Sequence, residues 1–291
     1  MDRSLDSFVA EIVASGAVTQ VDRAVIVNDG LEHVVVILDQ AVVARFPRDA
    51  TSAASLTSEA LLLERLSDKV TAPLPIPFHV SERFSLHRML HGAITTRSSL
   101  TALSSVARER LLDEVGRFLE ELGGIDPTGM HASSATTSKE RLDQLRRDVD
   151  VHVAPLLMQH QRESIDALFD LADRFTFNSA PRMIHGDLAP YHILHDTHTG
   201  ALTGVLDFGV AGVGDPAVDL GCLLACWGER VAQGLAKSWP MASALADGAR
   251  FVASMLPIEW AVAALAHGST EMAVAHLGHL ALDIAPFGES F

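Results

Sequence analysis

Residues 184–194 read IHGDLAPYHIL, and residues 206–209 read LDFG. Two carboxylates, Asp187 and Asp207, therefore lie twenty residues apart, each on a short polar segment beside apolar residues. Residues 201–206 follow a Thr/Gly-containing turn and are predicted to form a strand that ends at Asp207. In phosphoryl transfer, one carboxylate meets the attacking hydroxyl and another holds the magnesium ion that bridges the nucleotide phosphates. The spacing indicates such a base and metal ligand.

A third block, GDPAVDL, occupies residues 214–220. The order HGD, DFG and GDPxxDL resembles the catalytic core of the aminoglycoside phosphotransferase family, distant relatives of the protein kinases. The resemblance implies that Asp187 is the catalytic base and Asp207 a Mg²⁺ ligand. It assigns structural support to His185, Asp215 and Asp219, with Asp219 holding the catalytic loop from beneath. Asp215 could cap the following helix or touch the metal shell, and we expect a structural role.

One position departs from the family pattern, because His192 stands where most relatives carry Asn. An Asn carbonyl is the second magnesium ligand in kinase-type sites, and magnesium prefers oxygen donors to imidazole. His192 could bind the metal through a ring nitrogen or through water, or it could only brace the loop. The branches that phosphorylate the 2″-hydroxyl of aminoglycosides and the 2′-hydroxyl of macrolides look similar here. We therefore assign His192 to the metal site.

The amino-terminal third supplies candidates for nucleotide binding. Residues 31–38 and 41–46 are two apolar runs that predict a β-hairpin. Arg45 resembles the cation that reaches the nucleotide phosphates in the family, and residues 56–66 show helical spacing. By its place in the motif, Glu59 is expected to pair with Arg45. The alternative is an ordinary surface ion pair.

No glycine-rich phosphate-binding motif is present, so Walker-type and Rossmann folds lose support. Gly30 is the one glycine in the corresponding place that could let the backbone approach a phosphate. Residues 86–92 resemble the family's hinge, where Met89 would meet the base of the nucleotide. The resemblance implies an α+β, protein-kinase-like bilobal fold. Its parts are a small antiparallel-sheet nucleotide-binding lobe with one main helix (1–90) and a larger, mostly helical lobe with the catalytic and substrate sites (91–291).

Helices are predicted at residues 100–123, 139–158 and 161–175, and a buried one at 220–227, whereas 128–138 reads as a mobile loop. Gly123 and Gly124 are expected to end the first helix. Cys222 and Cys226 lie on one helix face and are interpreted as reduced, buried thiols.

Composition limits the possible partners. The chain has 37 acidic and 22 basic residues and a formal charge of −15, which argues against a nucleic-acid partner. No apolar run approaches the eighteen or so residues of a spanning helix, and the first residues lack a signal-peptide pattern, so a cytoplasmic protein without membrane contact is expected. A monomer or weak dimer is expected.

The resemblance implies a kinase that transfers the γ-phosphate of ATP or GTP to a hydroxyl of an aminoglycoside-like, cationic acceptor. A macrolide or another small alcohol is the alternative acceptor, and a non-catalytic nucleotide-binding protein is the alternative function. Only five residues separate DFG from Asp215-Pro216, and no Ala-Pro-Glu follows, so a protein-kinase activation segment has no room.

Overall fold

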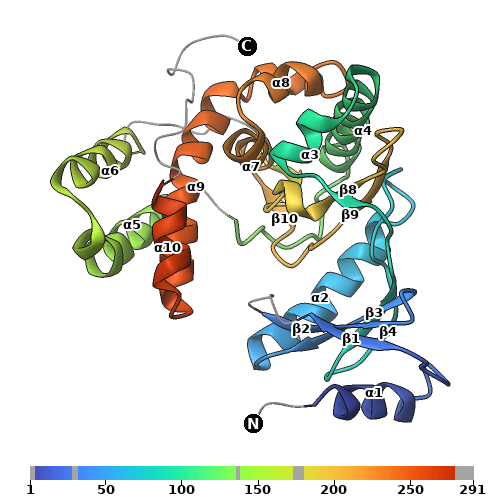
Figure 1. The fold of residues 1–291 in the computed structure, drawn as a ribbon. Coiled ribbons are helices and arrows are strands. Elements are labelled where there is room, and N and C mark those ends of the chain that lie inside the picture. Colours follow the sequence, from blue (N-terminus) through green and yellow to red (C-terminus); the bar gives the residue numbers. More distant parts are fainter. Residues whose placement is uncertain (1–3, 28–31, 136–137, 173–179, 279–291) are drawn as a thin grey trace.

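The computed structural model describes residues 4–27, 32–135, 138–172 and 180–278, and it has two lobes (Figure 1). The amino-terminal lobe is a five-stranded antiparallel sheet, and the larger lobe is mostly helical. The α+β, bilobal architecture expected from the sequence is therefore confirmed.

The sheet of the small lobe has the strand order β1-β2-β3-β5-β4. Its strands are β1 (Ala24–Val27), β2 (His33–Leu38), β3 (Val42–Pro47), β4 (Pro77–Val80) and β5 (Ser85–Arg88). The predicted hairpin is β2 and β3, which pair antiparallel. Residues 39–41 connect them, with left-handed φ angles of 50° and 53° at Asp39 and Gln40 and a hydrogen bond from the Ala41 amide to the Leu38 carbonyl at 2.9 Å. Strand β1 was not predicted, because it has only four residues, all at least partly exposed.

Two helices flank this sheet (Figure 1). Helix α1 (Leu5–Ala14) lies beneath it, where Phe8 packs on Phe46 with ring centroids 4.6 Å apart. Helix α2 (Ala50–Leu66) begins before the predicted start, because Asp49 caps it by accepting a hydrogen bond from the Ser52 amide at 2.8 Å. Its carboxyl-terminal leucines belong to the core of the large lobe, so α2 packs the two lobes together.

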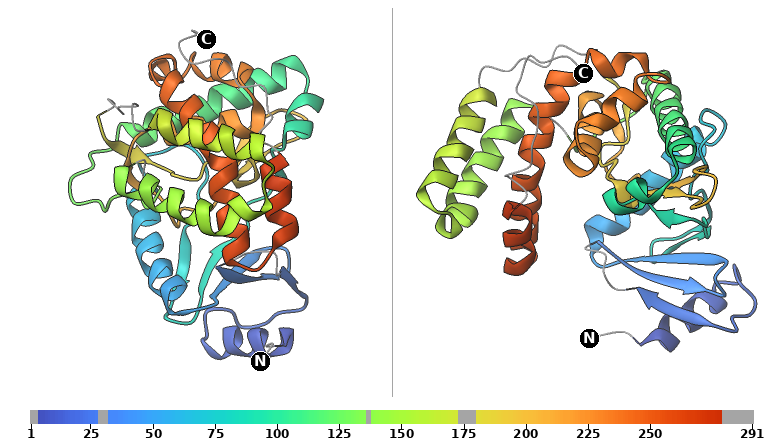
Figure 2. Two further views of the ribbon diagram at one scale, coloured as in Figure 1. Left: turned by 90° about the vertical axis from the view of Figure 1, so that its left-hand side faces the viewer. Right: turned by 45° about the horizontal axis from the view of Figure 1, so that its top comes forward.

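The large lobe contains eight α-helices in the described residues. They are α3 (Arg97–Ala102), α4 (Ser105–Gly123), α5 (Lys139–Asp148), α6 (Gln159–Ala172), α7 (Ala217–Trp227), α8 (Arg230–Leu235), α9 (Ala246–Ala266) and α10 (Thr270–Gly278). Helix α7 is buried along almost its whole length and packs on α9, as predicted for a central helix. Helices α5, α6, α9 and α10 form a group on one side of the lobe (Figure 2).

Two helix predictions were wrong in their limits. The helix expected at 100–123 is divided into α3 and α4, because Leu103 has an extended backbone and Ser104 caps α4 by accepting from the Ala107 amide. Gly124 caps the end of α4, as predicted. The helix expected at 139–158 leaves the α-helical form after Asp148 and continues as a π-helical turn and a 3₁₀ turn (Ala154–Leu156).

Helix α9 is 21 residues long and apolar enough to span a membrane by length and composition. The apolar run expected to be absent is interrupted here by Arg250 and Glu259, but the mean hydropathy of the helix is still 1.4. Within the described structure, 61% of its apolar window is buried, which is typical of a core helix.

Candidate active site

Five short strands position the site. β7 (Arg182–Ile184) pairs with β10 (Gly212–Gly214), and β8 (Ile193–His195) lies between β6 (Ala93–Ile94) and β9 (Leu202–Val205). The predicted hairpin before Asp207 is β8 and β9. The strand before Asp187 does not join it, because β7 pairs with β10 instead. Asp187 therefore lies on a loop between two separate small sheets.

Asp219 fixes the backbone of this loop. Its carboxylate accepts hydrogen bonds from the amides of His185 and Gly186 at 2.9 and 2.7 Å. Gly186 has a φ of 84°, a conformation that favours glycine. Burial raises the pKa of Asp219 to about 7, although the two amide donors act in the opposite direction. Both of these hydrogen bonds come from backbone amides, as expected for a residue that supports the loop.

The buried ring of His185 joins the two acidic loops. Its Nε2 lies 2.9 Å from the carbonyl oxygen of Leu206, the residue before Asp207. Its Nδ1 accepts the Asp187 amide at 3.3 Å, so Nε2 carries the proton. Burial and the neighbouring His192 lower the pKa of His185 to about 4, which keeps the ring neutral. His185 therefore sets the spacing between the two loops.

His192 lies between the two carboxylates. Its Nδ1 is 3.7 Å from an Asp187 carboxylate oxygen, and its Nε2 is 3.6 Å from one of Asp207. Nδ1 also lies 2.8 Å from the backbone carbonyl of Asp187, which can only accept, so Nδ1 is a donor. In the neutral ring, Nε2 then carries a lone pair directed toward Asp207. Loop bracing and metal binding by His192 are thus compatible, because they use different ring nitrogens.

The two carboxylates have pKa values displaced in opposite directions. Burial raises the pKa of Asp187, and the nearby Asp207 adds to this effect. Burial also acts to raise the pKa of Asp207, but the charges of His192 and Arg45 outweigh it and hold that pKa below its ordinary value. Asp207 also has a φ of 64°, which is strained for a non-glycine residue. Two acids with separated pKa values suit a base and a metal ligand.

Arg45, from β3, reaches the same place from the small lobe. Its Nη1 contacts both carboxylate oxygens of Glu59, on α2, at 2.7 and 2.8 Å. Glu59 also accepts the amide of Phe208 at 3.2 Å, and Arg45 Nη2 lies 4.0 Å from Asp207. The contact is buried on the Glu59 side, so it is not an ordinary surface pair. It connects the nucleotide lobe to the DFG segment.

Two other nucleotide-binding predictions have different outcomes. Gly30 lies outside the described residues. The Met89 amide donates to the Ala41 carbonyl at 2.8 Å, so within the described structure its carbonyl is the backbone group left for a base. Asp215 accepts the Ala217 amide at 2.8 Å at the start of α7, which is a helix-capping contact.

The donor set fits a magnesium ion of the kinase type. Magnesium is usually held by one or two carboxylates, with substrate phosphates and water completing its shell. Asp207 offers a half-exposed carboxylate, and His192 offers a ring nitrogen beside it. No group of three or more His, Cys, Asp or Glu side chains in the described ranges forms a protein-only metal cage. An ion bound here would therefore be coordinated partly by the protein and partly by substrate oxygens or water.

Sequence reasoning missed the residues beyond Asp187 that line the neighbouring space. Tyr191 packs edge-on against His192, with ring centroids 4.4 Å apart, and its side chain is half exposed. It is the only tyrosine of the chain and lies inside the segment 184–194, a signal that could have been used.

The Ser133 hydroxyl donates a hydrogen bond to the Val210 carbonyl at 2.6 Å, and Ala132 forms a β-bridge with Val213. The segment predicted as a mobile loop is therefore joined to β10.

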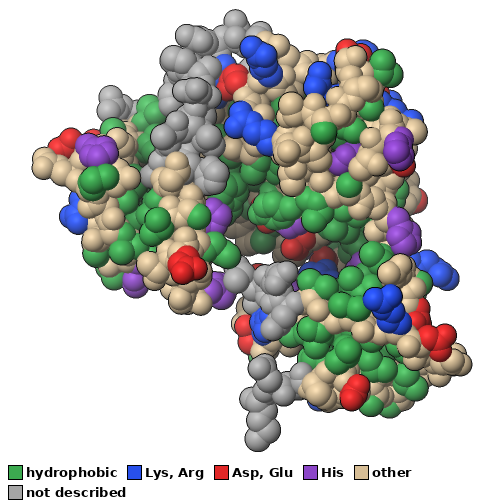
Figure 3. Space-filling model, viewed as in Figure 1, with side chains coloured by type: hydrophobic (Ala, Val, Ile, Leu, Met, Phe, Trp, Pro, Cys, Tyr) green, Lys and Arg blue, Asp and Glu red, His purple; other side chains and the backbone are tan. Residues whose placement is uncertain are grey.

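Figure 3 shows a hollow between the two lobes, with acidic and basic side chains inside it. The comparisons with known proteins give the family of the chain. The sequence pattern of the phosphotransferase enzyme family (APH) matches residues 24–251, and this chain belongs to that family. No curated protein sequence matches the chain.

Three solved structures illustrate the likeness. The GDP complex of aminoglycoside 2′-phosphotransferase-IIIa is 21% identical, with a TM-score of 0.85 and coverage of 96% of this chain and 97% of that one. The GDP and kanamycin complex of an APH(2″) enzyme is 22% identical, with a TM-score of 0.84 and coverage of 94% and 96%. The macrolide 2′-phosphotransferase from Brachybacterium faecium is 20% identical, with a TM-score of 0.69 and coverage of 96% and 99%. At these identities the likeness shows the fold. The family places the chain among phosphotransferases.

Proposed function

We propose that this chain transfers the γ-phosphate of ATP or GTP to a hydroxyl of a small antibiotic-like molecule. The observation that carries the proposal is the arrangement of Asp187 and Asp207, which lie on either side of His192 at 3.7 and 3.6 Å. The structural neighbours include complexes with GDP and kanamycin and a macrolide enzyme, so both acceptor classes are candidates. We place the lobe boundary near residue 90, after β5 and before β6.

Each side chain has one role in this scheme. Asp187 accepts the proton of the acceptor hydroxyl as the hydroxyl oxygen forms a bond to the γ-phosphorus. The bond between the γ-phosphorus and the bridging oxygen breaks, and the nucleoside diphosphate leaves with its electrons. Arg45 lies on the nucleotide phosphates, and Glu59 holds it there. Asp207 and His192 would hold magnesium, which would neutralise charge on the transferring phosphoryl group. Alignment and charge neutralisation supply most of the acceleration.

A non-catalytic nucleotide-binding role is the competing function, and the geometry of His192 argues against it. His192 Nε2 lies 3.6 Å from an Asp207 carboxylate oxygen, so a metal ion bound by Asp207 would be within reach of this nitrogen. The bond between Nδ1 and the Asp187 carbonyl sets that orientation. The proposed site therefore retains a second donor at the position where the family has Asn.

The test is an assay of nucleoside diphosphate release with ATP and GTP, run against a panel of hydroxylated antibiotics and metabolites. Asp187→Asn should lower turnover by roughly 10²–10⁴-fold with nucleotide affinity little changed. The control is Asp68→Asn, because that side chain is 71% exposed and distant from the site. Acceptor phosphorylation at the parental rate by Asp187→Asn would exclude the base assignment. Nucleotide binding without transfer to any acceptor would support the non-catalytic role.

A further inference from the structure

A cavity of about 360 Å³ opens beside the proposed base. Pro190 and Tyr191, from the loop that follows Asp187, form one wall. The remaining walls come from the start of α3 and from α7, α9 and α10. The Tyr191 ring packs on His192 with ring centroids 4.4 Å apart, and His192 Nδ1 lies 3.7 Å from an Asp187 carboxylate oxygen, so only His192 stands between this wall and the carboxylate. A molecule in the cavity would lie next to the residue that takes the hydroxyl proton.

The lining of this cavity is mostly aromatic and aliphatic. Trp260 projects from α9, and its ring lies 5.5 Å from that of His276 on α10. Burial raises the pKa of Cys226 to about 11, so it contributes a neutral thiol at physiological pH. Arg97 contributes a cation. Among the described residues that line the cavity, none is Asp or Glu.

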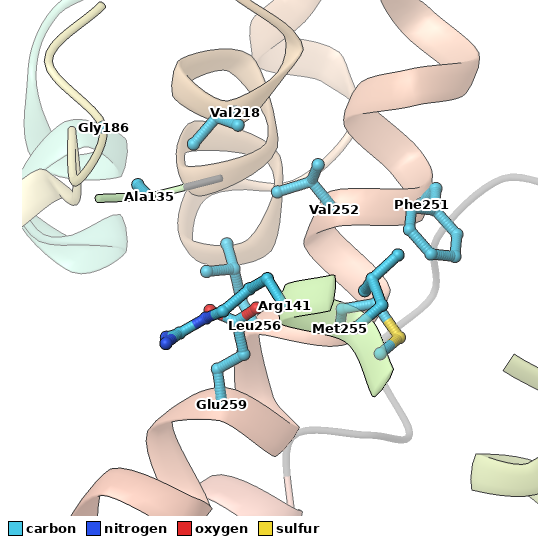
Figure 4. Close-up of a pocket in the computed structure, with 10 residues that line it drawn as sticks. Ala135, Arg141, Gly186, Val218, Phe251, Val252, Met255, Leu256 and Glu259 are labelled. Atoms are coloured by element: carbon cyan, nitrogen blue, oxygen red, sulfur yellow. The ribbon is translucent and has the colours of Figure 1, made fainter. Parts of the chain in front are cut away.

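The neighbouring cavity contains a carboxylate but is much smaller. It measures only about 40 Å³ and runs between α5 and α9 beside Gly186 (Figure 4). Glu259 is the acidic residue of its described lining, to which Arg141 also belongs. Burial raises the pKa of Glu259, whereas Arg141 acts to lower it. Glu259 lines this much smaller cavity and is not part of the described lining of the cavity beside Tyr191.

A polycationic aminoglycoside needs carboxylates to replace the water around its amines, because a buried, unpaired cation is costly. The net charge of −15 would attract such a molecule at long range, but it does not supply those local partners. An apolar ring system instead gains free energy from contact with Trp260, Tyr191 and Pro257. The local lining therefore favours a ligand with few charges.

Resting on the proposed function, we infer that this cavity is the acceptor site and that it takes a largely apolar hydroxylated molecule with at most one positive charge, of the macrolide kind. This reverses the order of acceptors expected from the sequence, where an aminoglycoside came first.

Binding is measured first, by calorimetry on the full chain with a 14-membered macrolide and with kanamycin, at physiological salt and with GDP present. The macrolide should bind at least about tenfold more tightly. Trp260→Ala should weaken macrolide binding by about tenfold or more, because it removes a large apolar contact. Phe78→Ala is the control, since Phe78 is 51% exposed on β4 of the small lobe and lies outside the cavity.

Arg97→Glu provides a second variant that should fold normally, because an acidic residue is favourable in the first turn of α3. It should strengthen kanamycin binding several-fold and leave macrolide binding almost unchanged. Kanamycin binding as tight as macrolide binding in the parental chain would overturn the inference. Macrolide affinity unaffected by Trp260→Ala would also overturn it.

Phosphate transfer is measured separately, so that the two proposals can fail independently. A macrolide that binds in a Trp260-dependent way but is never phosphorylated would support the cavity assignment and contradict the proposed function. Phosphorylation of kanamycin without phosphorylation or binding of the macrolide would support the proposed function and contradict the cavity assignment.

Discussion

The contact between Arg45 and Glu59 should be one of the strongest pairwise interactions in the protein. At 2.7 Å and an effective dielectric constant of about 20, the attraction between the charges is about 6 kcal/mol. In a double-mutant cycle the desolvation of each group cancels, and close charge pairs give coupling free energies of about 1.5–7 kcal/mol. We therefore expect a net coupling free energy of about 3 kcal/mol.

The coupling is measured by a double-mutant cycle with Arg45→Met and Glu59→Gln, using urea unfolding of the parental chain, both single variants and the double variant. Methionine keeps most of the apolar stem of Arg45. Glutamine keeps a carbonyl oxygen that can still accept the Phe208 amide. Each single variant should lose about 3–5 kcal/mol, because it leaves the other charge in the protein without its partner.

The surface pair Arg110 and Glu114 is the matched control. Its nitrogen–oxygen distance is 2.8 Å, almost the same as in the Arg45 pair, but the Arg110 side chain is 50% exposed. The corresponding cycle should give a coupling of only about 0.3–0.5 kcal/mol. Equal coupling in the two cycles would refute the reasoning, because burial would then add nothing to the Arg45–Glu59 interaction.

Three further outcomes are expected. Asp207→Ala should abolish the magnesium dependence of nucleotide binding in calorimetry, and unaltered binding would remove Asp207 from the metal shell. His192→Asn should keep most of the turnover if the side chain binds the metal, because Asn offers the oxygen donor that magnesium prefers; a folded but inactive variant would contradict this. Burial and Arg45 lower the pKa of His33 to about 4, so stability should be lost as pH falls from about 6.5 to 4. The share of this loss due to His33, about 2 kcal/mol after solvent screening, should disappear in His33→Gln, whereas the share due to His185 stays; the exposed control His160→Gln should leave the whole loss unchanged, as measured by urea unfolding at several pH values.

The local parts of the site could be predicted because their determinants are close in sequence. The HGD and DFG segments flank a hairpin, and turn residues and apolar runs encode a hairpin locally. The turn at Asp39 and Gln40 was predictable for the same reason. The limits of α3 and α4 were less predictable, since Leu103 continues the apolar pattern while Ser104 starts a new helix.

The sequence alone therefore determined the family resemblance, the α+β class and the candidate base and metal ligand. Only the tertiary structure showed that Glu59 bonds the backbone of Phe208, a contact across 149 residues. It also showed that the Met89 amide is already bonded to Ala41 and that five separate segments line the cavity beside Tyr191. Such features depend on packing between distant elements, and no local periodicity or motif encodes which side chains will meet there.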